Sequence, residues 1–326
     1  MRALVVERLA PDYAGCVLKD VPTREPGPGE ARLNVKAAAI NFPDLLMTRG
    51  EYQHKPALPF VGGLEMAGEV AAVGEGDEGW RVGDAVVCGG AGGFAEQAIV
   101  RASSLRSKPA RMSFSEAAAY GAAYLTAFVA LVWRAKAKPD EWVLVHGAAG
   151  GVGLACVDLA KALGLKVIAA SASDAKLAVV ARDYAPDAIL NITGGFREKV
   201  KALTAGRGAD IIYDPVGGDV FDESTRCIAF EGRLLVVGFT SGRIATIPTN
   251  IPLIKGFSVV GVRAGEYGRQ FPDRGAENLN TIWAMAEDGQ TRPRVHAELP
   301  LARWREAFAL LENREVIGKA VIRPDL

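Results

Sequence analysis

The segment that most constrains the fold runs from Trp142 to Gly153 and reads W-V-L-V-H-G-A-A-G-G-V-G. The residues that follow Trp142 form a short apolar run of the kind found in strands buried on both faces. Glycines come directly afterwards, and residues 154–163 are apolar and alanine-rich at helical spacing. The pattern predicts a strand, a glycine turn and a helix.

This arrangement suits the pyrophosphate of a dinucleotide, because a negatively charged group must approach bare backbone amides at a helix N-terminus. An ordinary glycine-rich turn is the alternative. A second predicted strand, Leu165 to Ala170, completes a βαβ unit of about thirty residues and favours the nucleotide site. The residues expected to cradle the pyrophosphate are Gly147, Ala148, Ala149, Gly150, Gly151, Val152 and Gly153.

The end of that second strand bears on which cofactor is bound. An NAD site usually has an acidic residue there, whereas this chain has Ser171 and Ser173, with Lys176 close behind. Small hydroxyls and a cation suit a 2′-phosphate, so we expect NADPH rather than NADH. Two alternatives remain open at this point: Asp174 is near enough to serve NADH, and Lys176 is also consistent with a solvated helix-face lysine.

Composition places the chain among ordinary globular proteins. It has 326 residues, 49% hydrophobic and 23% charged, with a formal net charge of zero, and its length suggests two domains. The absence of basic runs argues against a nucleic-acid or membrane-surface partner. The sequence shows neither a secretory signal layout nor an apolar run of transmembrane length, which predicts a cytoplasmic protein. Its four cysteines form no C-x-x-C pair, so we expect no disulfide framework.

The sequence patterning predicts an α/β protein with two domains. Short strands between tight turns fill the first hundred residues and indicate a β-rich, barrel-like domain. From residue 124 to 261 strands and helices alternate, which indicates a doubly wound parallel sheet. We expect residues 1–123 and 262–326 to form one domain and residues 124–261 the other.

Individual elements are predicted from hydrophobic periodicity and from start and stop signals. A Ser113–Glu116 capping box predicts a helix start, and an apolar helix is expected over 124–135. The remaining expectations are strands over 1–6, 32–39, 188–191, 210–214, 232–239 and 320–322, a turn that leads into a strand over 82–87, and helices over 196–204, 220–229, 279–287 and 301–311.

Several motifs together resemble the medium-chain dehydrogenase/reductase superfamily, and specifically its zinc-free quinone oxidoreductase branch. They are A-I-N-F-P-D at 39–44, R-G-E-Y at 49–52, P-F-V-G-G-L-E-M-A-G-E-V at 59–70, G-A-A-G-G-V-G at 147–153 and D-P-V-G-G at 214–218. The resemblance covers nearly the whole chain. It implies a GroES-like β-barrel domain built from both chain ends around a Rossmann domain, with the active site between them.

The zinc-dependent relatives in this superfamily carry a G-H-E triplet and a cysteine that bind catalytic zinc. Here the triplet is Gly63-Leu64-Glu65 and the cysteine position is Asn41, and neither leucine nor asparagine replaces those ligands. The histidines are His54, His146 and His296. We therefore predict no metal, which makes alcohol oxidation less favourable than reduction of an electrophilic acceptor.

The resemblance also assigns the reacting groups. Asn41 would donate to the nicotinamide carboxamide or to a substrate oxygen, Tyr52 would donate a hydrogen bond or proton to the developing oxygen, and Thr126 would lie beside the nicotinamide. A packing role for Tyr52 and a backbone-bonded helix threonine at Thr126 are the alternatives. Further cofactor contacts are implied for Asn191, Gly238, Phe239, Thr240 and Lys319.

These features predict an NADPH-dependent, zinc-free oxidoreductase that transfers hydride to a quinone or an α,β-unsaturated carbonyl. The alternatives are an enoyl thioester (enoyl-CoA) reductase and a non-catalytic NADPH-binding redox sensor or structural protein. The resemblance also implies a homodimer, formed through an edge strand around Phe257 to Val262.

Overall fold

The computed structural model describes residues 1–76, 79–90 and 92–326. The chain divides into two compact units, Met1–Ala122 with Pro293–Leu326, and Ala123–Arg292. The first unit therefore contains both ends of the chain, as the resemblance implied. Within the described ranges no helix is long and apolar enough to cross a membrane.

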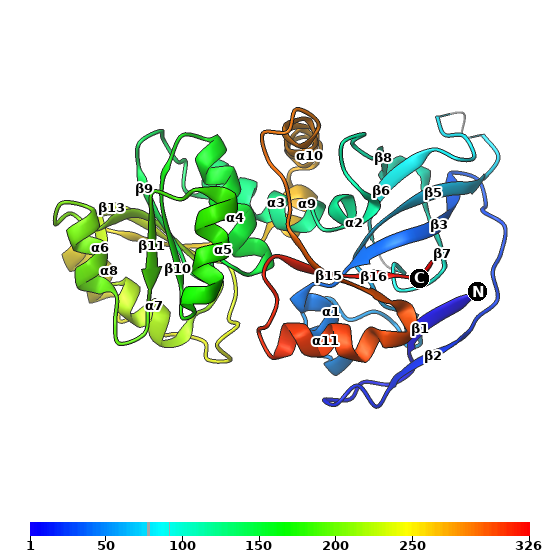
Figure 1. Cartoon of the computed structure of the whole chain (residues 1–326), viewed down its shortest axis with the longest axis horizontal. Coiled ribbons are helices and arrows are strands. Elements are labelled where there is room, and N and C mark those ends of the chain that lie inside the picture. Colours follow the sequence, from blue (N-terminus) through cyan, green and yellow to red (C-terminus); the bar gives the residue numbers. More distant parts are fainter. Residues whose placement is uncertain (77–78, 91) are drawn as a thin grey trace. The chain divides into compact units, whose positions relative to one another are not determined.

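The first unit is rich in β-structure (Figure 1). Its strands are β1 (Arg2–Val6), β2 (Cys16–Asp20), β3 (Glu30–Ala39), β4 (Phe60–Val61), β5 (Glu65–Val73), β6 (Ala85–Gly89), β7 (Gln97–Arg101), β8 (Leu105–Ser107), β15 (Val295–Pro300) and β16 (Lys319–Arg323). One sheet has the order β2-β1-β4, and another has the order β15-β16-β3-β5-β6-β8, with β7 also paired to β3. This is the predicted GroES-like domain.

Burial along β3 shows why this unit folds around one core. Buried and half-buried residues alternate over the first part of the strand, as the pleat requires when one face is covered. Its buried Leu33 and Val35 join a cluster with Leu4 of β1 and Ile322 of β16. Since β16 pairs antiparallel with β3, the end of the chain completes a sheet begun near its start.

Three helices of this unit are α1 (Phe42–Arg49), α2 (Phe114–Ala118) and α11 (Trp304–Glu312). The predicted capping box at α2 is confirmed: the Ser113 hydroxyl accepts from the Glu116 amide at 3.1 Å, and the Glu116 carboxylate accepts from the Ser113 amide at 2.8 Å. The helix predicted over 301–311 is α11, preceded by a short 3₁₀ turn over Leu301–Arg303.

The second unit is a parallel sheet covered by helices. Its strands are β9 (Trp142–Val145), β10 (Lys166–Ser171), β11 (Ala188–Asn191), β12 (Ala209–Asp214), β13 (Ile228–Val236) and β14 (Ser258–Gly261). Its helices are α3 (Gly121–Phe128), α4 (Gly151–Ala162), α5 (Asp174–Tyr184), α6 (Arg197–Leu203), α7 (Gly218–Ser224), α8 (Asn250–Lys255), α9 (Ala264–Gln270) and α10 (Pro272–Glu287). α3 starts two residues before the boundary of the unit.

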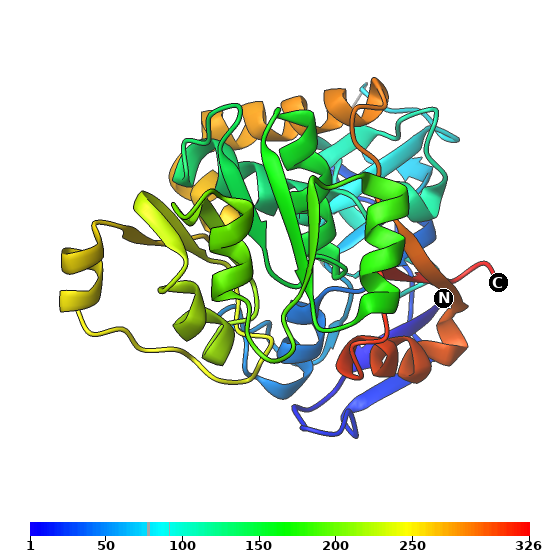
Figure 2. The ribbon, with the colours of Figure 1, turned by 60° about the vertical axis from the view of Figure 1, so that its left-hand side comes forward.

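The strand order β11-β10-β9-β12-β13-β14, with every pairing parallel, is that of a doubly wound Rossmann sheet. In Figure 1, α4 and α5 lie on one face of this sheet and α6 and α8 on the other. Figure 2 shows the same strands from another direction, with helices of the unit in front of them. β9, whose last three residues are fully buried, lies next to the point where the strand order reverses.

Three element predictions for this unit need correction. The apolar helix expected over 124–135 is α-helical only to Phe128 and continues as a π-helical segment, Val129–Arg134. The helix expected over 220–229 ends at Ser224, because β13 already starts at Ile228. β13 is irregular after that start, and its turn-like Glu231, with a φ of 61°, explains why the strand was expected only from 232.

The boundary expected at residue 262 lies earlier than the observed one at Arg292, because α9 and α10 belong to the second unit. Trp133 explains this attachment. Its indole N–H donates to the Asn278 carboxamide at 2.8 Å, and its ring stacks on Tyr267 at 6.0 Å between centroids. The predicted helix over 279–287 is the second half of α10, which packs within the parallel-sheet unit rather than with the barrel.

Candidate functional site

The glycine turn after β9 has the geometry of an anion cradle. Gly147 has a φ of 57°, a left-handed conformation that favours glycine. A Cβ atom at Gly153 would lie 2.1 Å from the Gly147 carbonyl oxygen, so only glycine allows α4 to start this close to the turn. The N-cap of α4 is Gly150, which makes no side-chain cap. The first amides of α4, which have no acceptor within the helix, are therefore not covered by a capping side chain.

The polar residues at the end of β10 are linked by hydrogen bonds to the start of α5. Ser173 caps α5, its hydroxyl accepting from the Lys176 amide at 3.4 Å, and the Ser171 hydroxyl accepts from the Ser173 amide at 3.3 Å. The Asn191 carboxamide, at the end of the neighbouring β11, donates to the Asp174 carboxylate at 2.7 Å. The Asp174 carboxylate, the acidic group that follows β10 most closely in the sequence, is thus engaged by Asn191.

The loops after β12 and β13 are tied together at the same edge of the sheet. The buried Asp214 carboxylate accepts from the Val216 and Gly217 amides at 2.8 and 2.9 Å, which fixes the D-P-V-G-G turn. Burial raises the pKa of Asp214, and those two amides oppose the shift. Both the amide and the hydroxyl of Thr240 donate to the Pro215 carbonyl at 3.1 Å. This contact holds the second loop beside the first.

Gly238 and Phe239 therefore lie in a loop and not at the end of a strand, because β13 stops at Val236. They contribute to the lining of a hollow of about 160 Å³ that is mostly apolar, with Phe221 and Val259 also on its wall. The Phe239 side chain is 42% exposed. Backbone and side chain of this loop are thus accessible at the carboxyl edge of the sheet, where ligands bind in such folds.

His146 lies beneath the glycine turn and is completely buried. Its Nε2 shares a hydrogen bond of 2.8 Å with the Ser224 hydroxyl, and its ring meets Phe196 edge-on at 4.9 Å between centroids. Burial lowers its pKa to about 3, so the ring is neutral at physiological pH. His146 is therefore a packing residue beneath the glycine turn.

A buried charge cluster surrounds Asn41 in the first unit. The Lys319 ammonium, at the start of β16, donates to Asn41 Oδ1 at 2.5 Å and to Glu65 Oε1 at 2.9 Å. Asn41 Nδ2 donates to the same Glu65 oxygen at 2.9 Å, and Glu65 Oε2 accepts from the Ala122 amide at 2.9 Å. Glu65 and Lys319 are only 5% and 6% exposed. The family resemblance implied a contact between Lys319 and the cofactor. In the structure the Lys319 ammonium is hydrogen-bonded within this cluster.

Asp44 completes the cluster from the first turn of α1. Its carboxylate accepts from the Asn41 amide at 2.8 Å through Oδ2, while its buried Oδ1 has no hydrogen-bond partner among the described residues. Burial raises the pKa of Asp44 to about 7; the bond from Asn41 and the charge of Lys319 oppose this rise, and the charge of Glu65 adds to it. The Asp44 carboxyl group therefore changes protonation near neutral pH.

The two other predicted reacting residues are placed on separate units. Tyr52 is half-buried in the segment between α1 and β4, and His54 nearby is exposed. Thr126 is half-buried on α3. Asn41 and Tyr52 thus belong to the barrel unit and Thr126 to the Rossmann unit. Their roles toward a ligand stay predictions.

Comparison with known proteins matches both units to described families. Residues 27–110 match the model of the alcohol dehydrogenase GroES-like domain, and residues 151–280 match that of zinc-binding dehydrogenases. The chain is 40% identical over 304 residues to the quinone oxidoreductase-like protein 2 homolog of Nematostella vectensis, which spans 92% of this chain and 83% of that protein. The chain belongs to the quinone oxidoreductase branch of the medium-chain dehydrogenase/reductase superfamily.

Solved structures with a similar fold match nearly the whole chain. A probable oxidoreductase from Mycobacterium abscessus is 36% identical with a TM-score of 0.88, and the match covers 99% of each chain. Escherichia coli quinone oxidoreductase, solved as a complex with NADPH, is 28% identical with a TM-score of 0.89 over 99% of this chain and all of that one. The predicted family and fold class are confirmed.

The residues around the Gly63-Leu64-Glu65 triplet bear on whether this chain could hold zinc. Among the residues that the structure describes, no group of three or more His, Cys, Asp and Glu side chains is arranged to hold a metal ion. The acidic residue of the triplet, Glu65, is paired with Lys319. An ammonium group thus supplies the positive charge beside this carboxylate.

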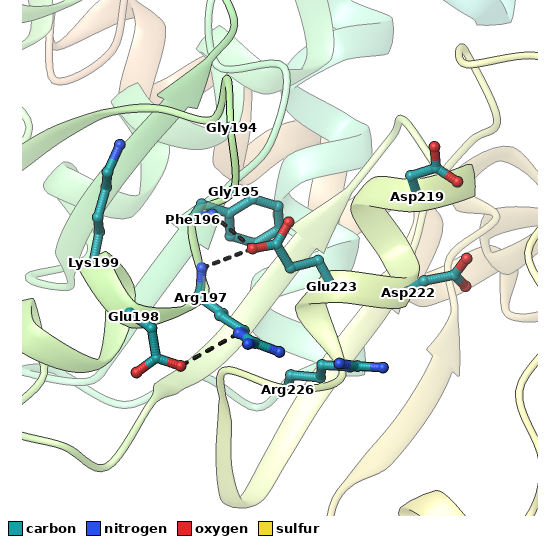
Figure 3. Close-up of a pocket in the computed structure, with 10 residues that line it drawn as sticks. All are labelled: Gly194, Gly195, Phe196, Arg197, Glu198, Lys199, Asp219, Asp222, Glu223 and Arg226. Atoms are coloured by element: carbon teal, nitrogen blue, oxygen red, sulfur yellow. Dashed lines mark hydrogen bonds and ion pairs between the residues drawn. The ribbon is translucent and has the colours of Figure 1, made fainter.

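Sequence reasoning did not single out a hollow of about 630 Å³ on the Rossmann unit, between the start of α6 and the length of α7 (Figure 3). Its wall carries Arg197, Lys199 and Arg226 together with several acidic side chains. Glu223 accepts from the Phe196 and Arg197 amides at 2.6 and 3.0 Å, so a carboxylate already occupies the start of α6. Since the hollow's charges of both signs nearly balance, it favours neither an anion nor a cation.

Proposed function

We propose that this protein is an NADPH-dependent, zinc-independent oxidoreductase that transfers hydride to a quinone or an α,β-unsaturated carbonyl. The observation that carries the proposal is the glycine turn, where the approach of Gly153 to Gly147 brings uncapped helix amides to the carboxyl edge of the sheet. The NADPH complex of the Escherichia coli relative supports it.

The residues of the Rossmann unit fit this cofactor. The amides at the start of α4 would hold the pyrophosphate, and Ser171, Ser173 and Lys176 would hold a 2′-phosphate. Asn191 supports the choice of NADPH because it engages the nearby Asp174. The loop 238–240 would contact the nicotinamide ribose. When bound, the dihydronicotinamide supplies the hydride.

On the substrate side, Asn41 would donate a hydrogen bond to a carbonyl oxygen and Tyr52 would donate a hydrogen bond or proton as that oxygen gains charge. Thr126 would position the nicotinamide. Without a metal to polarise the carbonyl, the acceptor must already be electrophilic, which favours quinones and enones over the reverse oxidation of an alcohol. The pairing of Glu65 with Lys319 supports zinc independence.

The first test is NADPH oxidation against quinones, enones and enoyl-CoA esters, with and without a chelator. We expect chelator-resistant turnover of quinones or simple enones. Preference for the thioesters would establish the enoyl reductase instead. NADPH binding without turnover of any acceptor would favour a redox sensor or structural protein.

Tyr52→Phe tests the proposed proton donor. We expect the turnover number to fall about 10- to 100-fold because the phenol hydroxyl is lost while the ring is kept. Tyr267→Phe in α9, whose hydroxyl accepts from Arg274 at 3.2 Å, is the matched control. Unchanged turnover in Tyr52→Phe would leave Tyr52 with a packing role only.

A homodimer in the cytoplasm completes the proposal. β14 lies at the edge of the parallel sheet, so one side of the strand has backbone groups that a second copy can pair with. Leu253 and Ile254 on the adjoining α8 are 81% and 72% exposed. The four cysteines are free and buried, which agrees with a reducing compartment. Light scattering at micromolar concentration should give twice the mass of the chain; the mass of one chain would refute the dimer.

A further inference from the structure

The contacts around Asn41 fix which way its carboxamide is turned. A primary amide has one oxygen that accepts and two N–H groups that donate. The Asn41 oxygen accepts from the Lys319 ammonium at 2.5 Å, and one N–H donates to Glu65 at 2.9 Å. The Asn41 side chain also faces the Asp44 backbone amide in the capping box of α1. Among the residues that the structure describes, the second N–H of this amide has no acceptor, so it can donate to a ligand.

The opposite orientation of the Asn41 amide is disfavoured by its contacts with both charged neighbours, Glu65 and Lys319. A flipped Asn41 would place its oxygen against the Glu65 carboxylate and its NH₂ group against the Lys319 ammonium. Both contacts would be repulsive, and they would lie in a buried region where charges are poorly screened. The ion pair between Glu65 and Lys319 at 2.9 Å therefore selects one of the two orientations.

The ion pair is itself held from other elements. Glu65 Oε2 accepts from the Ala122 amide at 2.9 Å, and the Lys319 amide donates to the Arg294 carbonyl at 2.9 Å. Asp44 holds the Asn41 backbone amide at 2.8 Å. Three elements thus meet at the Asn41 carboxamide: the starts of α1, β5 and β16. These contacts fix the orientation of the carboxamide more firmly than packing at a helix end would require.

We propose that Glu65 and Lys319 are positioning residues that hold Asn41 as a hydrogen-bond donor, so that the site accepts a carbonyl oxygen in preference to a hydroxyl or amine donor. This inference rests on the proposed function, in which Asn41 faces the substrate. It assigns Lys319 an action through Asn41, whereas the resemblance assigned it a contact with the nucleotide.

A double-mutant cycle separates these two roles of Lys319. Lys319→Met should lower kcat/KM for an enone about 10- to 100-fold, as loss of a supporting contact does elsewhere, with less than a twofold change in the Kd for NADPH. In an Asn41→Ala background the same substitution should change kcat/KM less than twofold further. A multiplicative loss in that background, or a large rise in the Kd for NADPH, would overturn the inference.

Two further variants keep the cycle interpretable. Glu65→Gln with Lys319→Met removes both charges at similar volume, so it should fold even if Lys319→Met alone does not, and it should show the same loss of kcat/KM. Lys36→Met is the matched control, since Lys36 pairs with Glu69 at 3.6 Å on the same unit and is partly exposed. We expect it to retain wild-type kinetics.

A readout that needs no turnover distinguishes failure of this inference from failure of the proposed function. The side-chain NH₂ signal of Asn41, assigned by its loss in Asn41→Asp, should exchange with solvent at least about tenfold more slowly in the wild type than in the Glu65→Gln/Lys319→Met variant. Equal exchange would refute the positioning role. Slow exchange in a wild-type protein that reduces no acceptor would refute only the proposed function.

Discussion

The glycine turn of the Rossmann unit and the Asn41 cluster of the barrel unit are built in opposite ways. The turn presents main-chain amides, and its specificity comes from the lack of side chains at Gly147 and Gly153. The cluster presents side chains, and its geometry comes from the buried charges of Glu65 and Lys319. We therefore expect the glycine turn to be most sensitive to an added side chain, and the Asn41 cluster to be most sensitive to the loss of one charged partner.

The largest effect is expected where an atom is added to the turn. Gly153→Ala places a Cβ 2.1 Å from the Gly147 carbonyl oxygen, so α4 must move away from the turn. We expect the Kd for NADPH to rise more than about 100-fold, a loss of about 2.7 kcal/mol or more in binding free energy. Fluorescence titration measures it.

Gly265→Ala in α9 is the matched control, because the nearest atom to its added Cβ is 3.9 Å away. This variant should bind NADPH as the wild type does and should be slightly more stable, since alanine favours a helix by about 0.5–1 kcal/mol over glycine. Tight NADPH binding by Gly153→Ala would show that the turn does not hold the pyrophosphate.

The pH dependence of stability tests the charged site. Burial raises the pKa of Asp44 to about 7, above the value of about 3.9 expected in the unfolded chain. Between these values the native state holds a proton that the unfolded state has lost. The contribution of Asp44 to stability is therefore fully present below about pH 4 and is lost as the pH rises through 7.

Urea unfolding of the wild type and Asp44→Asn at pH 5 and pH 8 measures this contribution. We expect Asp44→Asn to lose less stability than the wild type between these pH values, by roughly 2 to 4 kcal/mol. Asp158, whose pKa burial raises to about 6, remains in both proteins and cancels in the comparison. Parallel pH profiles would mean that Asp44 is ionised throughout.

The smallest effect is expected at the edge of the cofactor site, where solvent screens the charge. Lys176→Ala should raise KM for NADPH about tenfold, because one charge-assisted bond to the 2′-phosphate is lost, and should leave KM for NADH unchanged. Lys161→Ala, which removes an ion pair with Asp187 at 2.8 Å on the same unit, is the control. An equal rise for both cofactors would argue against a phosphate contact.

The difference between the glycine turn and the Asn41 cluster also explains which of the two sites could be predicted from the sequence. The glycine turn was predictable because its strand, glycines and helix are contiguous, and the end of β10 follows within one βαβ unit. The Asn41 cluster was not, since Asn41 and Lys319 are 278 positions apart and Glu65 and Lys319 are 254 apart. No local pattern reports such a pairing. The antiparallel pairings of β3 with β16 and with β5 bring it about.

Two predicted boundaries were wrong for a related reason. The end of the Rossmann unit was expected at residue 262, where strand and helix alternation stops, but Trp133 holds α9 and α10 to that unit through Asn278 and Tyr267. The start of β13 was hidden by the turn-like Glu231, a local signal that the parallel pairing with β12 overrides. In both cases tertiary contacts decided against a local signal.

The most direct test of the account is transfer of deuterium from NADPH, labelled at the nicotinamide C4 position, to an enone. The protein is first treated with a chelator to remove any metal, and the product is analysed by mass spectrometry. We expect product that carries one deuterium on carbon when the label is on the transferred face, and an unlabelled product when it is on the other face. Product without deuterium from either labelled cofactor, or loss of all turnover with the chelator, would contradict direct, metal-free hydride transfer.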